Sequence, residues 1–347
     1  MSVALDDRIG LKHGAGGRAM RRLIQDTFAT AFQTDPPQLA GVLGLSAMDD
    51  GAAIRVGPRW LVFTTDSHVI KPIFFPGGDI GRLAVCGTVN DLAMMGAVDV
   101  VGLSCAVIIE DGFPRCDLDR IVASMRDASR EAGAPILTGD TKVMGKGEID
   151  GVVINTSGIG FAAGRPVPDS GLHPGDRILV TGTVGDHGMA IMATRHGLSL
   201  DAGLSSDVAP INRLIRAALE AAPDGVTAMK DPTRGGVAST LHEMAAKSGV
   251  GIVIEEAAVP VRRETRGIAE LVGIDPLLVA NEGKAVIGVR AEAAAAVLAA
   301  LRAHPQGREA AEIGVCTADR PGMLVLETGF GRRLIAEPEG ELLPRIC

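Results

Sequence analysis

The chain has 347 residues, of which 46% are hydrophobic and 22% charged, and its net charge is −8. This length and composition are typical of a folded protein with two domains. The acidic balance, without any lysine and arginine block, argues against a nucleic acid partner. Charges interrupt every long apolar run, no signal peptide pattern is visible and the five cysteines are widely spaced, so we expect a cytoplasmic protein with reduced thiols and no membrane contact.

The first forty residues contain a glycine turn followed by one helical pattern. The turn lies at residues 13–17, and apolar residues recur at helical spacing over residues 18–32. Two prolines at 36 and 37 end the pattern. We therefore expect residues 1–40 to form an N-terminal segment that begins with a glycine loop.

Short apolar runs then alternate with glycine turns over residues 41–164. The runs predict strands and helices in the following order: strand 60–63, helix 81–95, strand 98–109, helix 118–132, strand 136–137 and strand 151–161. This alternation is typical of an α/β domain.

A stretch rich in proline and glycine, residues 165–175, separates this region from a second one that extends to residue 330. Its pattern predicts one early strand and three helices, at 177–180, 188–196, 208–222 and 291–302. Residues 331–347 show no periodicity and end in Cys347, so we expect a flexible tail.

Acidic residues recur in the first domain, at Asp50, Asp66, Asp91 and Asp140. Asp91 is the most informative, because apolar residues surround it on the predicted helix and a buried carboxylate is costly unless it is paired or bound to a metal. If these carboxylates converge, they offer the oxygen ligands that Mg²⁺ prefers when it also bridges nucleotide phosphates. Taken singly, each turn aspartate is better explained as an ordinary turn former, and only Asp91 favours a functional role.

Three glycine-rich loops invite comparison with nucleotide-binding loops. Residues 182–188 follow a strand and open a helix, but their glycine spacing departs from the dinucleotide fingerprint. Residues 139–147 lack the spacing of a P-loop. Residues 231–236 place Arg234 and free backbone amides before a helix, which suits either a phosphate cradle or a simple helix entry.

Three further polar residues, His68, Lys142 and Glu282, lie in turns where proton transfer could be arranged, although each also suits a solvated surface position. Cys347 is a weak nucleophile without help, because an ordinary thiol has a pKa of about 8.5 and the adjacent terminal carboxylate raises it further. The tail can nevertheless carry the thiol over a long distance, because the seventeen residues from Gly331 extend at most about 55 Å. These features suit a thiol that carries a group to a catalytic site.

Taken together, eight short motifs spread over nearly the whole chain resemble the aminoimidazole ribonucleotide synthetase-like superfamily, and specifically its hydrogenase maturation branch. The motifs lie at residues 13–17, 48–53, 64–68, 90–96, 138–142, 231–236, 281–283 and 344–347. The resemblance implies a mixed α/β (α+β) two-domain fold with a flexible C-terminal tail. It also implies that residues 41–164 bind ATP and dimerise, and that residues 165–330 form a layered α/β domain.

The same resemblance assigns roles to individual residues. It implies ATP contacts at Gly16, Gly17, Asp50, Asp66, Asn90, Asp91, Gly139, Asp140 and Arg234, with Mg²⁺ held by Asp50, Asp66, Asp91 and Asp140. It implies that His68, Lys142 and Glu282 surround a carbamoyl group carried on Cys347, with His68 as a candidate base and Lys142 as a stabiliser of the oxygen.

The implied reaction is the ATP-dependent dehydration of that carbamoyl group to a thiocyanate, which supplies a cyanide ligand for the iron of nickel-iron hydrogenase. The implied partners are a second copy of the chain, a carbamoyltransferase that loads the cysteine and an iron-carrying scaffold complex that accepts the cyanide. Two alternatives remain: another ATP-dependent enzyme of the superfamily that acts on a free small molecule, and a non-catalytic carrier that uses the terminal thiol to hold metal.

Overall fold

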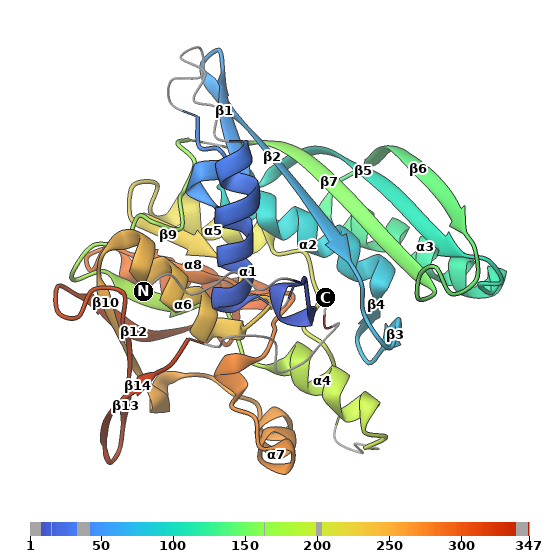
Figure 1. Ribbon diagram of the computed structural model, residues 1–347. Helices are drawn as coiled ribbons and strands as arrows, with labels where there is room; N and C mark the ends of the chain where they lie inside the picture. Colours follow the sequence, from blue (N-terminus) through green and yellow to red (C-terminus); the bar gives the residue numbers. More distant parts are fainter. Residues whose placement is uncertain are drawn as a thin grey trace.

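The computed structural model describes residues 8–14, 16–32, 42–162, 164–198, 203–337 and residue 346. Two sheets, each with helices packed against it, make up the molecule, and a short N-terminal helix stands in front of the junction between them (Figure 1). None of the described helices is long and apolar enough to cross a membrane. The mixed α/β architecture with two sheets is the one expected from the sequence.

The first sheet has five strands in the order β1-β2-β7-β5-β6. Its strands are β1 (Ala52–Val56), β2 (Arg59–His68), β5 (Asp99–Glu110), β6 (Ile136–Met144) and β7 (Val152–Ala162). Only β5 and β6 pair in parallel within this sheet, because the helix between them carries the chain back to the starting edge. A two-stranded ribbon of β3 (Phe74–Phe75) and β4 (Gly78–Asp79) precedes the first helix.

Helices α2 (Ile80–Met94) and α3 (Arg115–Ala132) cover one face of this sheet (Figure 1). The side chain of Asp79 caps α2 by accepting a hydrogen bond from the backbone N–H of Arg82, and Gly133 ends α3 in the left-handed conformation. Almost every residue of α2 is buried, because the helix lies between the first sheet and the second unit. Both helices lie within two residues of their predicted positions apart from the earlier start of α3.

The opposite face of the first sheet is not covered by any described segment and carries exposed apolar side chains. Phe63, Val101 and Ile159 are exposed on it, and Leu137 and Val143 are about two-thirds exposed on the edge strand β6. Every residue of β6 before Met144 is exposed. An open apolar sheet face with an unpaired edge is a surface that proteins normally cover with a partner.

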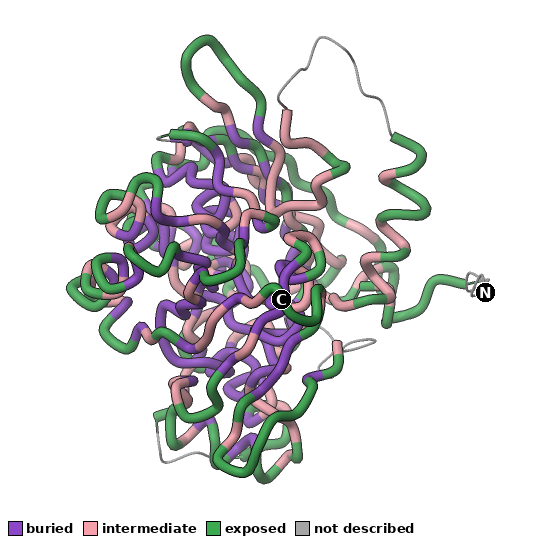
Figure 2. The backbone as a smooth tube through the Cα atoms, turned by 90° about the vertical axis from the view of Figure 1, so that its left-hand side faces the viewer, coloured by how far each residue is buried: buried purple, intermediate pink, exposed green. Residues whose placement is uncertain are grey.

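The second sheet has seven strands in the order β14-β13-β10-β12-β8-β11-β9. Its strands are β8 (Arg177–Val180), β9 (Val226–Lys230), β10 (Gly251–Glu255), β11 (Val286–Val289), β12 (Ala311–Thr317), β13 (Leu324–Thr328) and β14 (Gly331–Ile335). Only β10 and β13 pair in parallel. Figure 2 shows the buried residues as a continuous interior that runs through both units.

Helices cover both faces of the second sheet. They are α4 (Asp186–Arg195), α5 (Asn212–Ala221), α6 (Gly236–Ser248), α7 (Arg263–Val272) and α8 (Ala294–Ala303). Helix α6 packs in one core cluster, whereas α5 and α8 pack in another that also holds the end of α2. Helices α4 and α7 complete the cluster that contains α2 and α3, so the two units share their interior.

Two predictions about secondary structure need correction. The segment from residue 331 is not irregular at its start, because Gly331–Ile335 forms β14 and pairs antiparallel with β13. The tight turn at residues 328–331 and the ion pair between Arg332 and Glu327 stabilise this hairpin. Helix α5 begins at Asn212 rather than at residue 208, because Pro210 interrupts the helical pattern. The boundary proposed at residue 164 stays a prediction.

The predicted N-terminal helix forms as α1 (Gly17–Leu23), which continues as a π-helical stretch over Ile24–Ala29. It is joined to the second unit by an ion pair between Arg21 and Glu337. The guanidinium of Arg234 also donates to the backbone carbonyl of Gly14, at 3.2 Å. The N-terminal segment therefore lies over residues that follow β9 and β14.

A matched pair of glycine substitutions tests the packing of α2. A Cβ atom on Gly81 would lie 2.5 Å from the backbone oxygen of Ile121 in α3, whereas a Cβ on Gly267 in α7 meets no atom within 4 Å. We expect Gly81→Ala to lower the free energy of unfolding by about 1–3 kcal/mol. Gly267→Ala should raise it by up to about 1 kcal/mol through helix propensity. Urea unfolding of both variants measures the difference, and equal effects would contradict this packing.

Candidate functional site

The alternation of β2 brings three polar side chains to the face that α2 covers. Thr64, Asp66 and His68 share that face, because side chains two residues apart on a strand point the same way. Thr64 donates a hydrogen bond to Asp91 of α2, with Oγ1 at 3.1 Å from Oδ2. Gly87 permits the close packing, since a Cβ there would lie 2.8 Å from the His68 ring. The site therefore forms where β2 crosses α2.

Four carboxyl groups converge at this crossing: Asp50, Asp66, Asp91 and Asp231. Burial, and then the carboxylates of Asp231, Asp66 and Asp50, raise the pKa of Asp91 well above its ordinary value. Burial, and then Asp50, raise the pKa of Asp231 to about 8. Because buried carboxylates repel one another, a cation bound among them would be stabilised.

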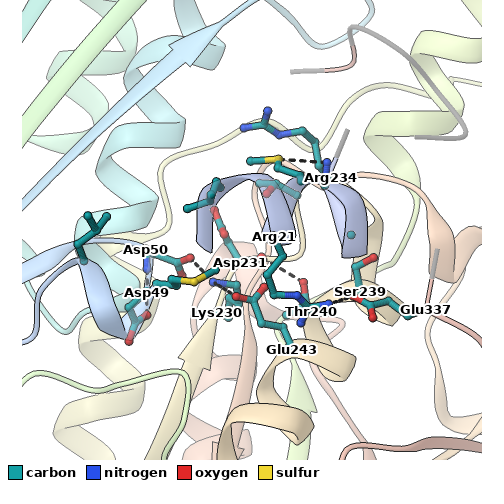
Figure 3. A pocket seen from close by; sticks show the side chains of 17 residues that line it. Arg21, Asp49, Asp50, Lys230, Asp231, Arg234, Ser239, Thr240, Glu243 and Glu337 are labelled. Carbon is teal, nitrogen blue, oxygen red and sulfur yellow. Dashed lines mark hydrogen bonds and ion pairs between the residues drawn. The ribbon is translucent and has the colours of Figure 1, made fainter. Parts of the chain in front are cut away.

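Lys230, at the end of β9, provides one cation beside this cluster. Its Nζ lies 2.5 Å from Oδ1 of Asp50, 3.4 Å from Asp169 and 4.0 Å from Glu243. Burial alone would lower the pKa of Lys230, but these three carboxylates raise it well above the usual value. Figure 3 shows Lys230 between Asp50 and Glu243. The other oxygen of Asp50, Oδ2, is buried without a hydrogen-bond partner in the described part of the chain.

A cavity of about 310 Å³ opens beside Lys230 and Asp231. The N-terminal glycines Gly16 and Gly17 line it, together with Arg234, which Figure 3 labels. Gly16 has a φ of 77° and its Cα lies against Arg234, so that a Cβ there would be 2.9 Å from the Cβ of Arg234. The glycine loop and the 231–236 loop, far apart in sequence, thus form two walls of one cavity.

His68 and Glu282 are both buried, with 1% and 4% of their surfaces exposed. Neither ring nitrogen of His68, nor Oε1 of Glu282, has a hydrogen-bond partner within the described residues. Burial lowers the pKa of His68 and raises that of Glu282 well above its ordinary value. Burial therefore favours the neutral form of both groups, and each has an atom available for proton exchange with a bound molecule. The alternative of solvated surface positions is wrong for both residues.

Asn90 connects the site to the second unit. Its Nδ2 donates to the carbonyls of Ala209 and Glu282, at 3.1 and 3.2 Å, and its Oδ1 accepts from the backbone N–H of Ile211. Both amide hydrogens are used within the protein, so the predicted contact of Asn90 with ATP is limited to a remaining lone pair of Oδ1. Its clear structural effect is to hold Glu282 against α2.

Asp140 and Lys142 lie elsewhere, on the exposed edge strand β6. Their side chains are 66% and 71% exposed and lie 3.8 Å apart, and Asp140 is not among the groups that perturb the pKa of Asp91. Gly139 has a packing role, because a Cβ there would lie 2.1 Å from the carbonyl oxygen of Cys105. Within one chain, the structure therefore does not join these three predicted residues to the acidic cluster.

Cys347 lies outside the described residues. The preceding residue, Ile346, is described and is buried with 2% of its surface exposed. It belongs to the core cluster that contains α2 and α4. The end of the chain is therefore packed into the molecule at this residue.

The donor set of the acidic cluster fits Mg²⁺ in chemistry, because it consists of carboxylate oxygens whose charges repel one another. No three histidine, cysteine, aspartate or glutamate side chains of the described residues form a ready-made metal site. Phosphate oxygens of a nucleotide would therefore have to complete the coordination. Four carboxylates and a glycine-lined cavity suit that combination.

This chain is similar to known proteins over nearly its whole length. The AIR synthase related protein family matches with its N-terminal domain over residues 48–162 and with its C-terminal domain over residues 173–326. The carbamoyl dehydratase HypE of Azotobacter vinelandii is 48% identical over 341 residues, which cover 98% of this chain and 97% of that protein. This chain belongs to the HypE family. The HypE of Escherichia coli is 46% identical over 342 residues, covering 98% of this chain and all of that protein.

Solved HypE structures have the same fold. A hydrogenase maturation protein HypE in complex with ATP is 44% identical, with a TM-score of 0.80, and covers 98% of this chain and 100% of that chain. The HypE of a HypE–HypF complex is 43% identical, with a TM-score of 0.83, and covers 91% and 99%. The HypE family membership and the AIR synthase related fold predicted from the sequence motifs are both confirmed.

Several residues of the site were not among those predicted. The sequence pattern singles out Asp231 only as part of the 231–236 loop. It indicates no functional role for Lys230, which follows an apolar run, or for Glu243, which interrupts an apolar pattern. Asp207, whose Oδ1 accepts from the backbone N–H of Glu282 at 3.0 Å, was also missed. A lysine at the end of an apolar strand directly before an aspartate is the one local sign that could have indicated Lys230.

Replacing Asp231 with asparagine should stabilise the protein in a pH-dependent manner. The folded pKa of about 8 exceeds the ordinary value, so the folded state binds a proton that the unfolded state releases between about pH 4 and 8. Stability from this group is therefore lost as the pH rises to 8. We expect Asp231→Asn to raise the free energy of unfolding at pH 8 by at least roughly 1 kcal/mol, and by much less at pH 4. Thermal unfolding at both pH values measures this, and a loss of stability at pH 8 would contradict it.

Proposed function

We propose that this protein catalyses the ATP-dependent dehydration of a carbamoyl group on Cys347, its own last residue, to a thiocyanate. The supporting observation is the convergence of the acidic cluster with two buried side chains, His68, whose Nε2 lies 3.6 Å from Oδ2 of Asp66, and Glu282, whose Oε1 has no hydrogen-bond partner among the described residues. The HypE relatives named as carbamoyl dehydratases, at 46–48% identity over nearly the whole chain, support the choice of reaction. The cyanide would supply a ligand for the iron of nickel-iron hydrogenase.

ATP would bind in the cavity between the glycine loop and the 231–236 loop. The relative solved with ATP supports this ligand. The backbone amide of Gly17 and the guanidinium of Arg234 offer donors for phosphate oxygens, and the N–H of Gly16 would have to exchange its present contact with Sδ of Met20 to join them. Mg²⁺, held by Asp50, Asp66 and Asp91 with Asp231 nearby, would neutralise charge on the phosphates during transfer.

The dehydration requires a good leaving group and the removal of two amide protons. Transfer of the γ-phosphoryl group to the carbamoyl oxygen converts that oxygen into phosphate, and its departure with both N–H protons leaves S–C≡N, ADP and phosphate. His68 is neutral and has a free ring lone pair, so it can accept the first proton. Glu282, also buried beside the site, is the candidate for the second proton once it is ionised.

Lys142 and Asp140 would join the site from a second copy of the chain. They lie on the exposed edge strand next to the open apolar face of the first sheet, which a homodimer would cover. The positive charge of Lys142 would then stabilise the carbamoyl oxygen across the interface. The same arrangement would bring Gly139 and Asp140 to the nucleotide.

Two further partners follow from the chemistry. A carbamoyltransferase must load Cys347, and a HypE relative has been solved with HypF, which supports such a complex. An iron-carrying scaffold complex must accept the cyanide. The cysteines of the described residues are all free thiols, which fits a cytoplasmic location.

Intact-mass measurement of the loaded protein tests the reaction directly. After incubation with the transferase, its carbamoyl donor and ATP, the wild-type chain should gain a carbamoyl group and then lose one water. Without ATP the adduct should persist. Cys347→Ala should gain no adduct, and an adduct of equal yield on that variant would disprove the role of Cys347.

Asp91→Asn tests the acidic cluster in the same assay. The change keeps the shape but removes one carboxylate charge, so loading should be normal and the loss of water should slow on the order of a hundredfold, because charge neutralisation by the metal is worth several kcal/mol. Leu271→Ala, which truncates an exposed side chain on α7, serves as a control. Dehydration at the wild-type rate would remove Asp91 from the site.

Mixed dimers test whether Lys142 acts across the interface. Lys142→Ala and Cys347→Ala should each be inactive alone. When the two are unfolded, mixed in equal amounts and refolded, about half of the dimers contain one chain of each kind. In each mixed dimer, Lys142 of the Cys347→Ala chain would complete the site that acts on Cys347 of the Lys142→Ala chain. Dehydration should therefore return. Continued inactivity of verified mixed dimers would place Lys142 within its own chain's site, and full activity of Lys142→Ala alone would place it outside the site.

A further inference from the structure

The loop at residues 281–284 carries Glu282 into the candidate site, and its backbone is held on both sides of that residue. The backbone N–H of Asn281 donates to the carbonyl of Pro232 at 3.0 Å. The carbonyl of Glu282 accepts from Nδ2 of Asn90 in α2 at 3.2 Å. The loop is therefore joined to α2 and to the 231–236 loop beside the cavity.

The side chain of Asn281 joins the same loop to the glycine loop at residues 182–188. Its Oδ1 accepts from the backbone N–H of Gly185 at 2.7 Å, and its Nδ2 donates to the carbonyl of Pro232 at 3.1 Å. The 182–188 loop, which does not match a dinucleotide fingerprint, thus supports the segment that carries Glu282.

Asp207 makes a charged contact with this segment. Its Oδ1 accepts from the backbone N–H of Glu282 at 3.0 Å, and its Oδ2 lies 3.2 Å from Nζ of Lys284. Burial alone would raise the pKa of Asp207, but Lys284, then His187 and the Glu282 N–H, lower it below its ordinary value. The carboxylate is therefore ionised at neutral pH, and an ionised acceptor makes the stronger hydrogen bond.

Close packing fixes the distance between Asp207 and the 281–284 loop. A Cβ on Gly283 would lie 2.0 Å from the backbone oxygen of Asp207 and 3.1 Å from the backbone nitrogen of Ala209. A Cβ on Gly182 would lie 2.7 Å from Cε of Lys284. The backbones are in direct contact at these glycines, so the loop cannot shift along Asp207 without a clash.

The carboxyl group of Glu282, by contrast, is left available. Its Oε1 is buried and makes no hydrogen bond within the described part of the chain. A buried oxygen without a partner, on a backbone that is fully held, suits contact with a bound molecule. Burial raises the pKa of Glu282 most, three carboxylates raise it further and one guanidinium opposes them; these groups belong to Asp231, Asp207, Asp66 and Arg234.

We propose that Asp207 is a positioning residue for the dehydration: its carboxylate, paired with Lys284, fixes the main chain of Glu282 and thereby holds the Glu282 carboxylate where it takes the second amide proton. The proposal rests on the proposed function for that last step. In it the remaining N–H proton passes to Glu282, the C–O bond breaks with its electron pair leaving on phosphate, and the C≡N bond forms. Asp207 exchanges no proton, because it stays ionised beside Lys284.

Hydrogen exchange at the amide of Glu282 tests the contact without any catalysis. Asp207→Asn keeps an oxygen that can accept the N–H, whereas Asp207→Ala removes it. Exchange is measured by mass spectrometry with single-residue fragmentation, relative to the amides of β5 as a reference for global opening. We expect exchange at Glu282 to accelerate at least about tenfold in Asp207→Ala, and to stay within about threefold of the wild type in Asp207→Asn. Wild-type protection in Asp207→Ala would overturn the proposal.

A double variant keeps this test valid if Asp207→Ala folds poorly. Asp207→Ala leaves the ammonium of Lys284 without its carboxylate, which is costly in a site where that side chain is 12% exposed. Asp207→Ala with Lys284→Met removes both charges and still frees the Glu282 N–H. It should therefore show the same faster exchange, and wild-type protection in it would equally contradict the contact.

The loaded protein connects the contact with the reaction. The double variant should load with carbamoyl and reach half-saturation at the wild-type ATP concentration, but lose water on the order of a hundredfold more slowly, because the base is misplaced. Asp207→Asn should recover at least about tenfold of that loss. Loss of water at the wild-type rate in the double variant, or no recovery in Asp207→Asn, would overturn the positioning role.

A cycle with Glu282→Gln decides whether Asp207 acts through Glu282. Adding Asp207→Ala to Glu282→Gln should slow the loss of water little further, since the group that Asp207 positions is already gone. A full additional slowing would contradict the proposal. If the wild type itself never loses water, the proposed function fails, while the exchange rate at residue 282 still decides whether Asp207 holds that backbone.

Discussion

The burial of an ammonium group among carboxylates from both units is the interaction on which the rest of the site depends. Lys230, at the end of β9, contacts Asp50 from the first unit and Asp169 and Glu243 from the second. Removing either sign of charge would leave the other buried and uncompensated, which is strongly destabilising. The pair Lys230–Asp50 therefore holds the two sheets in one relative position and at the same time keeps the acidic cluster compact.

Helix α2 connects this junction of the two units with the candidate catalytic residues. It lies between the two units, and on one side it carries Asp91 and the gap at Gly87 into which His68 fits. On the other side Asn90 binds the backbone of Glu282 and of residues that precede α5. The candidate base, the acidic cluster and Glu282 consequently share one rigid helix as their support, although they come from segments more than two hundred residues apart.

In the proposed reaction, the substrate is carried on the tail of the same molecule. The thiol of Cys347 needs no strong nucleophilicity of its own, because the catalytic groups belong to the folded core. The segment after β14 comprises residues 336–347 and can extend at most about 40 Å. This is shorter than a free tail from Gly331, since the first five residues are fixed in β14. A covalently attached substrate would have a high local concentration at the site.

The sequence by itself determined the local elements and the identity of the acidic site. Apolar periodicity placed α2 and β5, and the motifs around Asp50, Asp66 and Asp91 named residues that do converge, since a buried carboxylate on an apolar helix needs a partner. Only the tertiary structure decided that Lys230 and Asp231 complete the cluster and that Lys142 stands apart on an open edge. It alone showed that Asp207 binds the backbone of Glu282. Such contacts join segments remote in sequence, so they depend on how the sheets pack and not on any local pattern.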